Sequence, residues 1–355
     1  MSIVGNSALS GNNLVRAVVE RLAGKLPPGW RIATKPARSQ GRSDIDSVLR
    51  VRGPDSSSAS IHVEAKQRLE PRDLDYMAAA LGPVRELPVL VVAPFLSPKV
   101  QERLRTLGFE YADLTGNIRL RLSKPGLYVE TYGAGTNPEP TVRDRRSLKG
   151  AKVGRLVRAL CDFRPPLGLR ELAKRAVVDA GYASRIVDLL DREALVARKP
   201  RGQINGIDWL GLLRRWSQEY SPFQRGRPRW YLAARGLAQL ADKLRTLSAR
   251  YAVSGSWAAT QFAPVAPPRL FLCYADDIAN VAQALDLRPA EAGSNVALVT
   301  PFDPVVYERT SQQKGTTVAA PSQIAADLLT SPGRGPNEAE ALMEWMRENE
   351  HAWRA

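Results

Sequence analysis

The N-terminal part of the chain is organised by two runs on either side of a turn rich in Gly, Pro, Asp and Ser: Ser43-Asp44-Ile45-Asp46-Ser47-Val48-Leu49-Arg50-Val51-Arg52 and Ile61-His62-Val63-Glu64-Ala65-Lys66. Alternating apolar and polar residues around such a turn predict an antiparallel β-hairpin. Successive side chains of a strand point to opposite faces. The apolar members should face the core: Leu49, Val51, Ile61, Val63 and Ala65. The polar members should share the other face: Asp46, Arg50, His62, Glu64 and Lys66.

This hairpin predicts a small polar site. With the turn centred near Ser56, Asp46 would lie opposite Lys66 and one step diagonal from Glu64. Adjacent strands are about 4.8 Å apart, so these side chains can converge. Two carboxylates suit Mg²⁺ or Mn²⁺, which bind through oxygen ligands and retain waters. We therefore expect a metal held by Asp46 and Glu64, with Lys66 orienting or deprotonating an attacking water.

The order Asp46, then Glu64-Ala65-Lys66, resembles the metal-binding core of the PD-(D/E)XK nuclease-like superfamily. In that family an acid on the preceding helix often completes the site, and Glu20 is the matching residue here. The resemblance thus implies a catalytic set, which is Glu20, Asp46, Glu64 and Lys66. The predicted order of helix, three strands, helix and strand over residues 12–94 agrees with it. The expected proline before the first acid is missing, and Asp44 competes with Asp46. The alternative interpretation is a solvated hairpin face.

The composition is typical of a globular protein of two or three domains, with 355 residues, 44% hydrophobic and 25% charged. The longest apolar run, residues 87–96, fits a buried strand and is too short to cross a membrane. The first residues lack the pattern of a signal peptide. Cys161 and Cys273 lie among apolar neighbours, so we expect buried thiols in a reducing cytoplasm. With only His62 and His351, a histidine zinc site or a Ser-His-Asp triad is not expected.

The net charge of +15 is unevenly distributed along the chain. Residues 136–250 carry 25 Lys and Arg against 11 Asp and Glu, whereas residues 251–355 carry 7 against 12. Such a basic segment indicates a polyanionic partner, and double-stranded DNA is the first candidate. A membrane is not expected, because no amphipathic anchor accompanies the charge.

Residues 143–220 contain the pattern of a second domain. Apolar spacing predicts helices near 153–160, 169–175 and 184–193, and residues 195–204 predict a β-hairpin with a basic tip. This order resembles a winged helix-turn-helix domain, in which the third helix enters the major groove and the wing lies along the backbone. The resemblance implies Tyr182, Ser184 and Arg185 as base readers. It implies Arg198, Lys199 and Arg201 as phosphate contacts. The alternative is a helical packing module with a solvated basic face.

After a predicted helix at Trp209–Tyr220, a basic segment follows. Arg225, Arg227 and Arg229 alternate with Gly and Pro, which predicts a loop that adds phosphate contacts to DNA. Trp230 could stack on a base, although burial is the commoner role of a single tryptophan.

Residues 228–355 predict an α/β domain. Helices are expected at 232–249, 277–287 and 338–348, with strands at 269–274 and 294–300. Gly255-Ser256 followed by a strand resembles the minimal nucleotidyltransferase fold. That chemistry needs two carboxylates on the strand, and Phe271-Leu272-Cys273 supplies none, so the resemblance is to a degenerate nucleotidyltransferase. Asp276 and Asp277 come at the strand's end, where capping the next helix is the simpler role. We expect a non-catalytic interaction domain.

The predicted fold class is therefore a multidomain α/β protein: a nuclease-like domain at 1–135, a winged helix-turn-helix at 143–220 and the interaction domain at 228–355. The whole order, together with Tyr111-Ala112-Asp113-Leu114-Thr115-Gly116-Asn117, resembles AbiEi-type antitoxin regulators of type IV toxin–antitoxin systems. That resemblance implies a cytoplasmic, nucleoid-associated transcriptional repressor that binds operator DNA as a homodimer and has a cognate toxin as partner. The second function left open is a Mg²⁺-dependent DNA endonuclease targeted by its winged helix.

Overall fold

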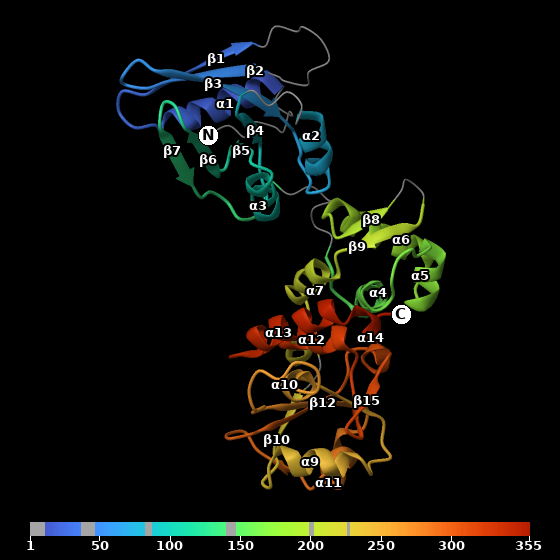
Figure 1. Ribbon diagram of the computed structural model, residues 1–355. Coiled ribbons are helices and arrows are strands. Elements are labelled where there is room, and N and C mark those ends of the chain that lie inside the picture. Colours follow the sequence, from blue (N-terminus) through green and yellow to red (C-terminus); the bar gives the residue numbers. More distant parts are fainter. Residues whose placement is uncertain (1–10, 37–46, 82–86, 140–146, 199–201, 226–227) are drawn as a thin grey trace, which may run out of the picture. The chain divides into compact units, whose positions relative to one another are not determined.

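The computed structural model describes residues 11–36, 47–81, 87–139, 147–198, 202–225 and 228–355. The chain divides into two compact units, residues 1–145 and 146–355 (Figure 1). In the described residues, no helix has the length and apolar character needed to span a bilayer.

The first unit is built on a seven-stranded sheet whose spatial order follows the chain, β1-β2-β3-β4-β5-β6-β7. Its strands are β1 (Arg31–Pro36), β2 (Ser47–Arg52), β3 (Ser58–Ala65), β4 (Val89–Ala93), β5 (Glu110–Asp113), β6 (Ile118–Leu122) and β7 (Leu127–Thr131). Its helices are α1 (Gly11–Ala23), α2 (Asp73–Leu81) and α3 (Pro98–Thr106). β3, β4 and β5 run parallel, and the other neighbouring pairs are antiparallel. The predicted order of helix, three strands, helix and strand is confirmed.

The two faces of this sheet carry separate cores. Apolar residues of α1 pack on one face together with Leu49, Val51, Ile61 and Val63, as the alternation predicted. Residues of α2 and α3 pack on the other face against Val89 and Val91. The helix α3 begins as expected, because the Ser97 side chain accepts a hydrogen bond from the Val100 N–H.

The register of the central hairpin differs by two residues from the prediction. Ser47 pairs with Val63, whereas a turn centred on Ser56 would pair Ser47 with Ala65. The reason is the tight turn itself. Asp55 accepts hydrogen bonds from both the N–H and the hydroxyl of Ser57, and the Gly53 N–H donates to the Ser57 carbonyl.

The second unit begins with a helical part. It contains α4 (Ala151–Asp162), α5 (Leu169–Arg175), α6 (Ala180–Arg192), the hairpin β8 (Val196–Arg198) and β9 (Ile204–Ile207), and α7 (Trp209–Ser217). Its apolar residues face inward at helical spacing, as the sequence predicted, and Cys161 and Cys273 are both buried free thiols as expected.

The rest of the second unit is a seven-stranded mixed sheet in the order β13-β10-β14-β12-β11-β16-β15. Its strands are β10 (Pro228–Leu232), β11 (Tyr251–Ser254), β12 (Phe271–Ala275), β13 (Arg288–Pro289), β14 (Val296–Val299), β15 (Ser311–Gln313) and β16 (Thr316–Val318). Its helices are α8 (Pro222–Arg225), α9 (Leu237–Leu244), α10 (Gly255–Ala259), α11 (Ile278–Ala284), the 3₁₀ helix η2 (Pro304–Tyr307), α12 (Pro321–Leu329), α13 (Gly335–Glu348) and α14 (Glu350–Trp353). Figure 1 shows α12 and α13 on one side of this sheet and α9 and α11 on the other.

Two sequence expectations for this region were wrong. The helix expected at 232–249 begins only at Leu237, because Leu232 belongs to β10 and Gly236 has a φ of 86°. The last long helix begins three residues earlier than expected, at Gly335, with proline in its first turn.

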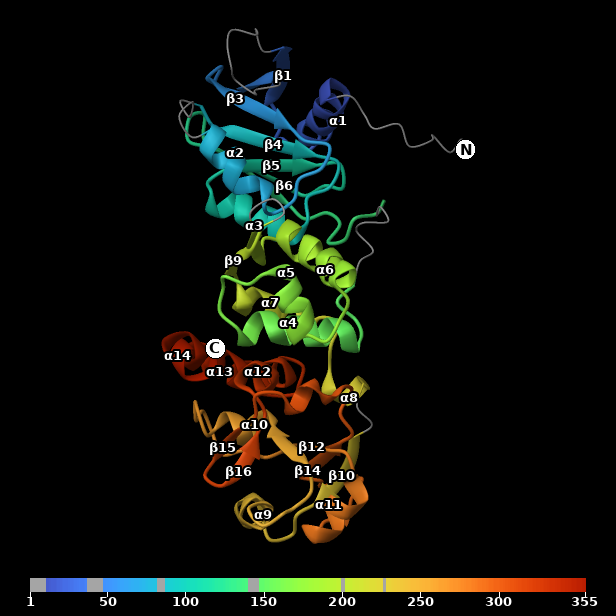
Figure 2. The same cartoon turned by 90° about the vertical axis from the view of Figure 1, so that its right-hand side faces the viewer.

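The helical part and the mixed sheet of the second unit share one hydrophobic core, which extends from Leu148 to Trp353 and is formed by residues of both. Figure 2 shows α12 and α13 between α4 and the strands of the sheet. The boundary expected between domains at 143–220 and 228–355 falls inside this unit.

Candidate functional site

The first candidate site contains a buried carboxylate at the end of β3. Glu64 pairs with Val91 across the parallel strands, so its side chain points to the face covered by α2 and α3. The Lys66 Nζ lies 2.6 Å from Glu64 Oε1, with the two side chains 40% and 3% exposed. A carboxylate so buried is stabilised by a nearby cation. The predicted proximity of Glu64 and Lys66 is therefore present.

Within the described residues, neither of the other two predicted acids, Asp46 and Glu20, is found beside Glu64. Asp46, and Asp44 as its alternative, lie outside them; the described strand begins at the next residue, Ser47. Glu20 lies on α1, which packs on the opposite face of the sheet from Glu64. Its side chain is 73% exposed and lies 3.9 Å from Arg16.

No group of three His, Cys, Asp or Glu residues that could hold a metal occurs within the described part of the chain. The one metal ligand that the described residues place here is the Glu64 carboxylate, since a lysine ammonium cannot coordinate a cation, and Mg²⁺ would need a further acid. The metal site thus stays a prediction that depends on Asp46.

The second candidate site is the helical part of the second unit. Leu167 forms a β-bridge with Ile204 of β9. The N–H group of each residue donates a hydrogen bond to the carbonyl of the other, at 3.0 and 2.9 Å. Leu167 lies between α4 and α5, so this short segment joins the helices to the hairpin. The order is helix, a single-residue β-bridge, two helices and two strands.

The three predicted base readers all lie in the first two turns of α6. Asp179 caps this helix by accepting a hydrogen bond from the Tyr182 N–H at 2.7 Å. Tyr182 and Ser184 are half-buried, and Arg185 is exposed. The Arg185 guanidinium lies 5.7 Å from the centre of the Tyr182 ring. Burial, the main cause, raises the pKa of Tyr182, so its hydroxyl stays neutral at physiological pH.

Lys152 adds a second cation beside Tyr182, with its Nζ 5.8 Å from the ring centre. Tyr182 is therefore flanked by cations from α4 and α6. Exposed Arg170 and Lys174 on α5 add further positive charge to the helical part. This concentration of cations around a partly exposed ring agrees with the charge distribution in the sequence.

The hairpin residues are only partly described. Arg198 forms an ion pair with Asp188 of α6, which ties the hairpin to that helix. Lys199 and Arg201, the other two predicted phosphate contacts, lie outside the described residues. Arg198 already has a carboxylate partner, so its charge is partly compensated before any phosphate approaches.

On both sides of residues 226–227, which lie outside the described residues, the basic segment after α7 has regular structure where a loop was expected. Residues 222–225 form α8, and residues 228–232 form the strand β10 between β13 and β14. Of the predicted contacts, the Arg225 side chain and Arg227 are outside the description, and Arg229 is exposed. Trp230 is 38% exposed and stacks on Phe223, with ring centres 5.8 Å apart. Trp230 is thus not fully buried, and one face of its ring is already stacked on Phe223.

The residues expected from the nucleotidyltransferase resemblance have structural roles. Asp277 caps α11 by accepting a hydrogen bond from the Asn280 N–H at 3.0 Å, as predicted. Asp276 accepts one from the Tyr307 hydroxyl at 2.9 Å. These two acids follow β12 and do not lie on it.

The run Tyr111–Asn117 has a structural role in the turn between β5 and β6. Asp113 is fully buried and accepts hydrogen bonds from the backbone N–H groups of Thr115, Gly116 and Asn117. Asn117 in turn accepts one from the Gly133 N–H at 2.8 Å. A Cβ on Gly133 would lie 2.4 Å from the Thr115 carbonyl oxygen, so only glycine fits there.

Sequence reasoning missed a buried polar network in the second unit. Asp327 of α12 accepts hydrogen bonds from the hydroxyls of Tyr220, Tyr274 and Ser254, and from Gln323 Nε2. Burial, the largest cause, raises the pKa of Asp327 to about 6. The available signal was the spacing of Gln323 and Asp327, four residues apart on a helix that is otherwise mainly apolar.

No protein-family model matches the chain, and no curated protein matches it. Among solved structures, the chain is similar to one described as "Structure of EndoMS in apo form", with 20% sequence identity and a TM-score of 0.21. The match covers 31% of this chain and 48% of that one, so the chain spans about half the length of the structure it matches. A likeness of this extent carries no conclusion about function.

Proposed function

We propose that the protein is a DNA-binding transcriptional regulator resembling AbiEi-type antitoxins, and that residues 147–220 bind duplex DNA as a winged helix. The observation that carries this proposal is the first turns of α6, where an exposed Arg185 lies beside Tyr182 at the capped start of the helix. In winged helices the corresponding region reaches base edges in the major groove.

Two further features support the proposal. The Leu167–Ile204 bridge links the segment between α4 and α5 to the β8–β9 hairpin, which supports a winged-helix arrangement. Residues 136–250 carry a large excess of cations, and neutralising phosphates with cations supplies most of the affinity of DNA-binding proteins. The AbiEi resemblance extends the proposal to a homodimer on an operator and to a cognate toxin.

Duplex DNA binding tests this proposal directly. The full chain is incubated with a random duplex library, bound DNA is enriched over several rounds, and the affinity for the enriched duplex is measured by fluorescence anisotropy. Arg185→Ala should weaken binding, whereas Arg269→Ala, which removes an exposed cation before β12, should not. The proposal would be contradicted if no duplex is enriched, or if Arg185→Ala and Arg269→Ala bind an enriched duplex with equal affinity.

A second function is favoured by the Glu64–Lys66 pair. In this proposal the first unit is a PD-(D/E)XK-type endonuclease, in which Asp46 and Glu64 would hold Mg²⁺ or Mn²⁺. The metal would supply charge stabilisation at the scissile phosphate. Lys66 would orient the water that attacks phosphorus, and the bond from phosphorus to the leaving oxygen would break.

Plasmid and linear DNA, with and without Mg²⁺ or Mn²⁺, separate the two functions. An endonuclease should nick or linearise the plasmid only with metal, and Glu64→Gln should abolish cleavage while leaving operator affinity unchanged. A regulator without nuclease activity should bind DNA and leave the plasmid intact in every condition.

A further inference from the structure

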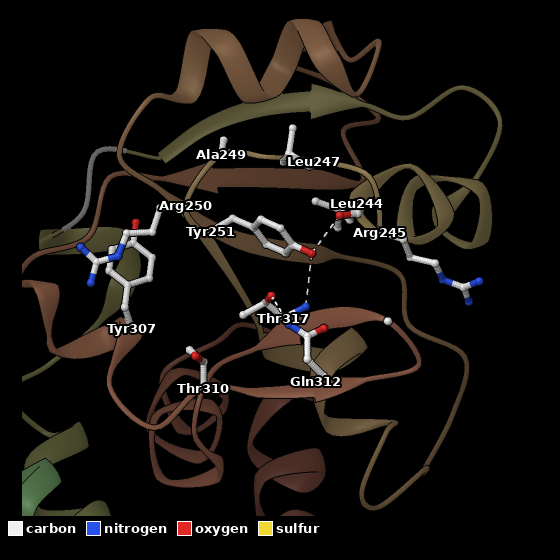
Figure 3. A pocket seen from close by; sticks show the side chains of 11 residues that line it. Leu244, Arg245, Leu247, Ala249, Arg250, Tyr251, Tyr307, Thr310, Gln312 and Thr317 are labelled. Carbon is white, nitrogen blue, oxygen red and sulfur yellow. Dashed lines mark hydrogen bonds between the residues drawn. The ribbon is translucent and has the colours of Figure 1, made fainter.

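The second unit contains a pocket of 350 Å³ at the end of α9 (Figure 3). Its walls come from α9, the start of β11, the end of η2 and the β15–β16 hairpin. The lining residues that carry polar groups include two arginines and no acid: Arg245, Arg250, Tyr251, Tyr307, Thr310, Gln312 and Thr317.

Hydrogen bonds hold one wall of the pocket in place. The Tyr251 hydroxyl donates to the Leu244 carbonyl at 3.0 Å and accepts from the Thr317 N–H at 3.2 Å. Gln312 Nε2 donates to Thr317 Oγ1 at 2.8 Å. Figure 3 shows Tyr251 between these partners, with Arg250 beside Tyr307 on one side and Arg245 on the other. These bonds fix the wall of the pocket around Tyr251.

The two arginines flank the pocket on opposite sides (Figure 3). The Arg250 guanidinium carbon lies 4.1 Å from the centre of the Tyr307 ring, which supports its planar group. Within the described residues, Arg250 has no carboxylate partner in an ion pair. Arg245 lies 3.4 Å from Asp242, but both side chains are more than half exposed, so this pair is weak.

The hairpin turn fits closely against Arg245. Gly315 has a φ of 79°, and a Cβ added to it would lie 3.2 Å from Cγ and Cδ of Arg245. The arginine stem therefore packs on the backbone of the turn, which limits where its guanidinium can go.

Two guanidinium groups without a lining acid favour a phosphate-bearing ligand. Guanidinium matches phosphate oxygens with paired hydrogen bonds, and hydroxyl and amide groups such as those of Thr310 and Gln312 can complete the contacts. A volume of 350 Å³ is at the lower end of the range for small-molecule sites. Both arginines come from the end of the basic segment 136–250, and the lining residues from 251–355 add no further cation.

One wall of the pocket is also held by the proposed DNA-binding part. Tyr307 is the last residue of η2, and side chains of α4 contact this segment. Arg158 of α4 donates hydrogen bonds to the Val305 carbonyl at 3.1 Å and to the Glu308 carbonyl at 3.0 Å. Arg155 of α4 lies 3.6 Å from Asp303. A ligand that shifts Tyr307 therefore acts on a segment to which α4 is bonded.

We propose that this pocket binds a small phosphate-bearing anion, and that its occupancy changes DNA affinity through residues 303–308. The first half stands independently, and the second half rests on the proposed DNA-binding function. A coupling of this kind requires that the anion bind the DNA-bound and DNA-free forms with different affinity, and the effect is then reciprocal.

Anion binding is tested by calorimetry on the full chain with inorganic pyrophosphate at constant ionic strength. The wild type should bind one pyrophosphate, and Arg250→Ala should weaken binding about tenfold or more, because a charge-assisted hydrogen bond is lost. Arg250→Lys should recover part of the affinity. Equal pyrophosphate affinity in wild type and Arg250→Ala would contradict the proposal that this pocket binds the anion.

The matched control is Arg269→Ala. Arg269 precedes β12, and Tyr251 pairs with Ala275 at the other end of that strand, so the control cation lies away from the pocket. It should bind pyrophosphate as the wild type does. Melting curves without anion establish that Arg250→Ala is folded, and Arg245→Ala provides an independent second loss of affinity if it is not.

The coupling is tested by measuring duplex DNA affinity with and without saturating pyrophosphate at matched ionic strength. We expect a change of about fivefold or more in the wild type, and in Arg250→Ala the same change only at a correspondingly higher pyrophosphate concentration. Pyrophosphate binding without any change in DNA affinity would overturn the coupling. If Arg250→Ala itself weakens DNA binding and pyrophosphate competes with DNA, the phosphate belongs to the DNA backbone, and the small-anion proposal is wrong. If the protein binds no DNA at all, the proposed function is contradicted. The calorimetry still tests whether the pocket binds a phosphate-bearing anion.

Discussion

Arg158 of α4 donates a hydrogen bond from Nη1 to Oε1 of Gln323 of α12 at 2.9 Å, although the two residues are separated by 165 positions in the sequence. The Arg158 side chain is 1% exposed and also pairs with Asp162 at 2.9 Å. A cation this deeply buried is held by carboxylate, amide and carbonyl oxygens from both parts of the second unit. The helices proposed to bind DNA are therefore joined to the mixed sheet by a charged network as well as by apolar packing.

Arg158→Ala should lower the free energy of unfolding by about 3–5 kcal/mol, because it leaves the buried Asp162 carboxylate without its charged partner. Urea denaturation followed by circular dichroism measures this change. The control is Arg347→Ala, whose side chain is 62% exposed and which should change stability by less than about 0.5 kcal/mol. Similar losses in the two variants would show that the buried pair has no special role.

The stability of the second unit should depend on pH through Asp327. Its folded pKa is raised from 3.8 to about 6, so the folded state binds this proton more tightly than the unfolded state. The resulting stabilisation is complete below pH 4 and is lost as pH rises through about 6, by up to about 3 kcal/mol. The difference in unfolding free energy between wild type and Asp327→Asn, measured from pH 4 to 7, should shift against the wild type. A constant difference would show that Asp327 titrates alike in both states.

DNA affinity should depend steeply on salt. If the basic helical part contacts six or more phosphates, the dissociation constant should rise by about 10³ or more between 50 and 200 mM salt, because bound counterions are released. Anisotropy titrations at several salt concentrations give the slope. A flat response would remove duplex DNA as the ligand of this region.

Arg185 and Arg201 should have different effects on specificity. Arg185→Ala should cost about 1–3 kcal/mol on the enriched duplex and relax preference at one base position, as expected for a base contact. Arg201→Ala should weaken all duplexes to a similar extent, since a phosphate contact carries no base information. Affinities for the enriched duplex and for single-base variants separate these outcomes. Specific and non-specific affinities that stay unchanged in both variants would contradict the winged-helix assignment.

Divalent metal should stabilise the first unit if Asp46 and Glu64 share an ion. The expected gain is about 2.7 kcal/mol at a hundredfold excess over the dissociation constant. Glu64→Gln should remove most of this gain, because an amide is a poorer ligand for a hard cation. Lys66→Ala should keep the gain and lose any cleavage. Thermal melts across a Mn²⁺ titration measure all three proteins, and a wild-type melting temperature indifferent to metal would falsify the metal site.

Much of the first unit could be predicted from its sequence because each signal there is local. Alternation in 47–65 identified which hairpin residues face α1, and Ser97-Pro98 located the start of α3. The register could not be predicted, since it depends on how Asp55 and Ser57 close the turn. A shift of this kind changes which side chains are neighbours while leaving every face unchanged.

The structure of the second unit is harder to predict from sequence, because the contacts that determine it join segments distant in the chain. Gly, Pro and Arg at 225–229 indicated a loop, yet residues 228–232 form a strand, which is stabilised by pairing with β14. Arg and Asp are usually surface residues, so the burial of Arg158 and Asp327 could not be predicted from sequence. Several of their hydrogen-bond partners are distant in the chain and become neighbours only on folding. Of the candidate sites, the local pair Glu64–Lys66 was found from sequence, whereas the buried network and the arginine pocket were not.

The bonds between α4 and the C-terminal segments have a consequence for the order of folding. Asp162 accepts from the Ser322 hydroxyl, and Arg354 Nε donates to the Cys161 carbonyl at 2.8 Å. Helices 151–217 therefore cannot complete their core until the ribosome has synthesised residues as far as Arg354. Until then they expose apolar surface that chaperones recognise, since contacts between distant segments form late and leave incomplete intermediates. A nascent chain of this protein would thus acquire stable helices at 151–217 only after the mixed sheet has been made.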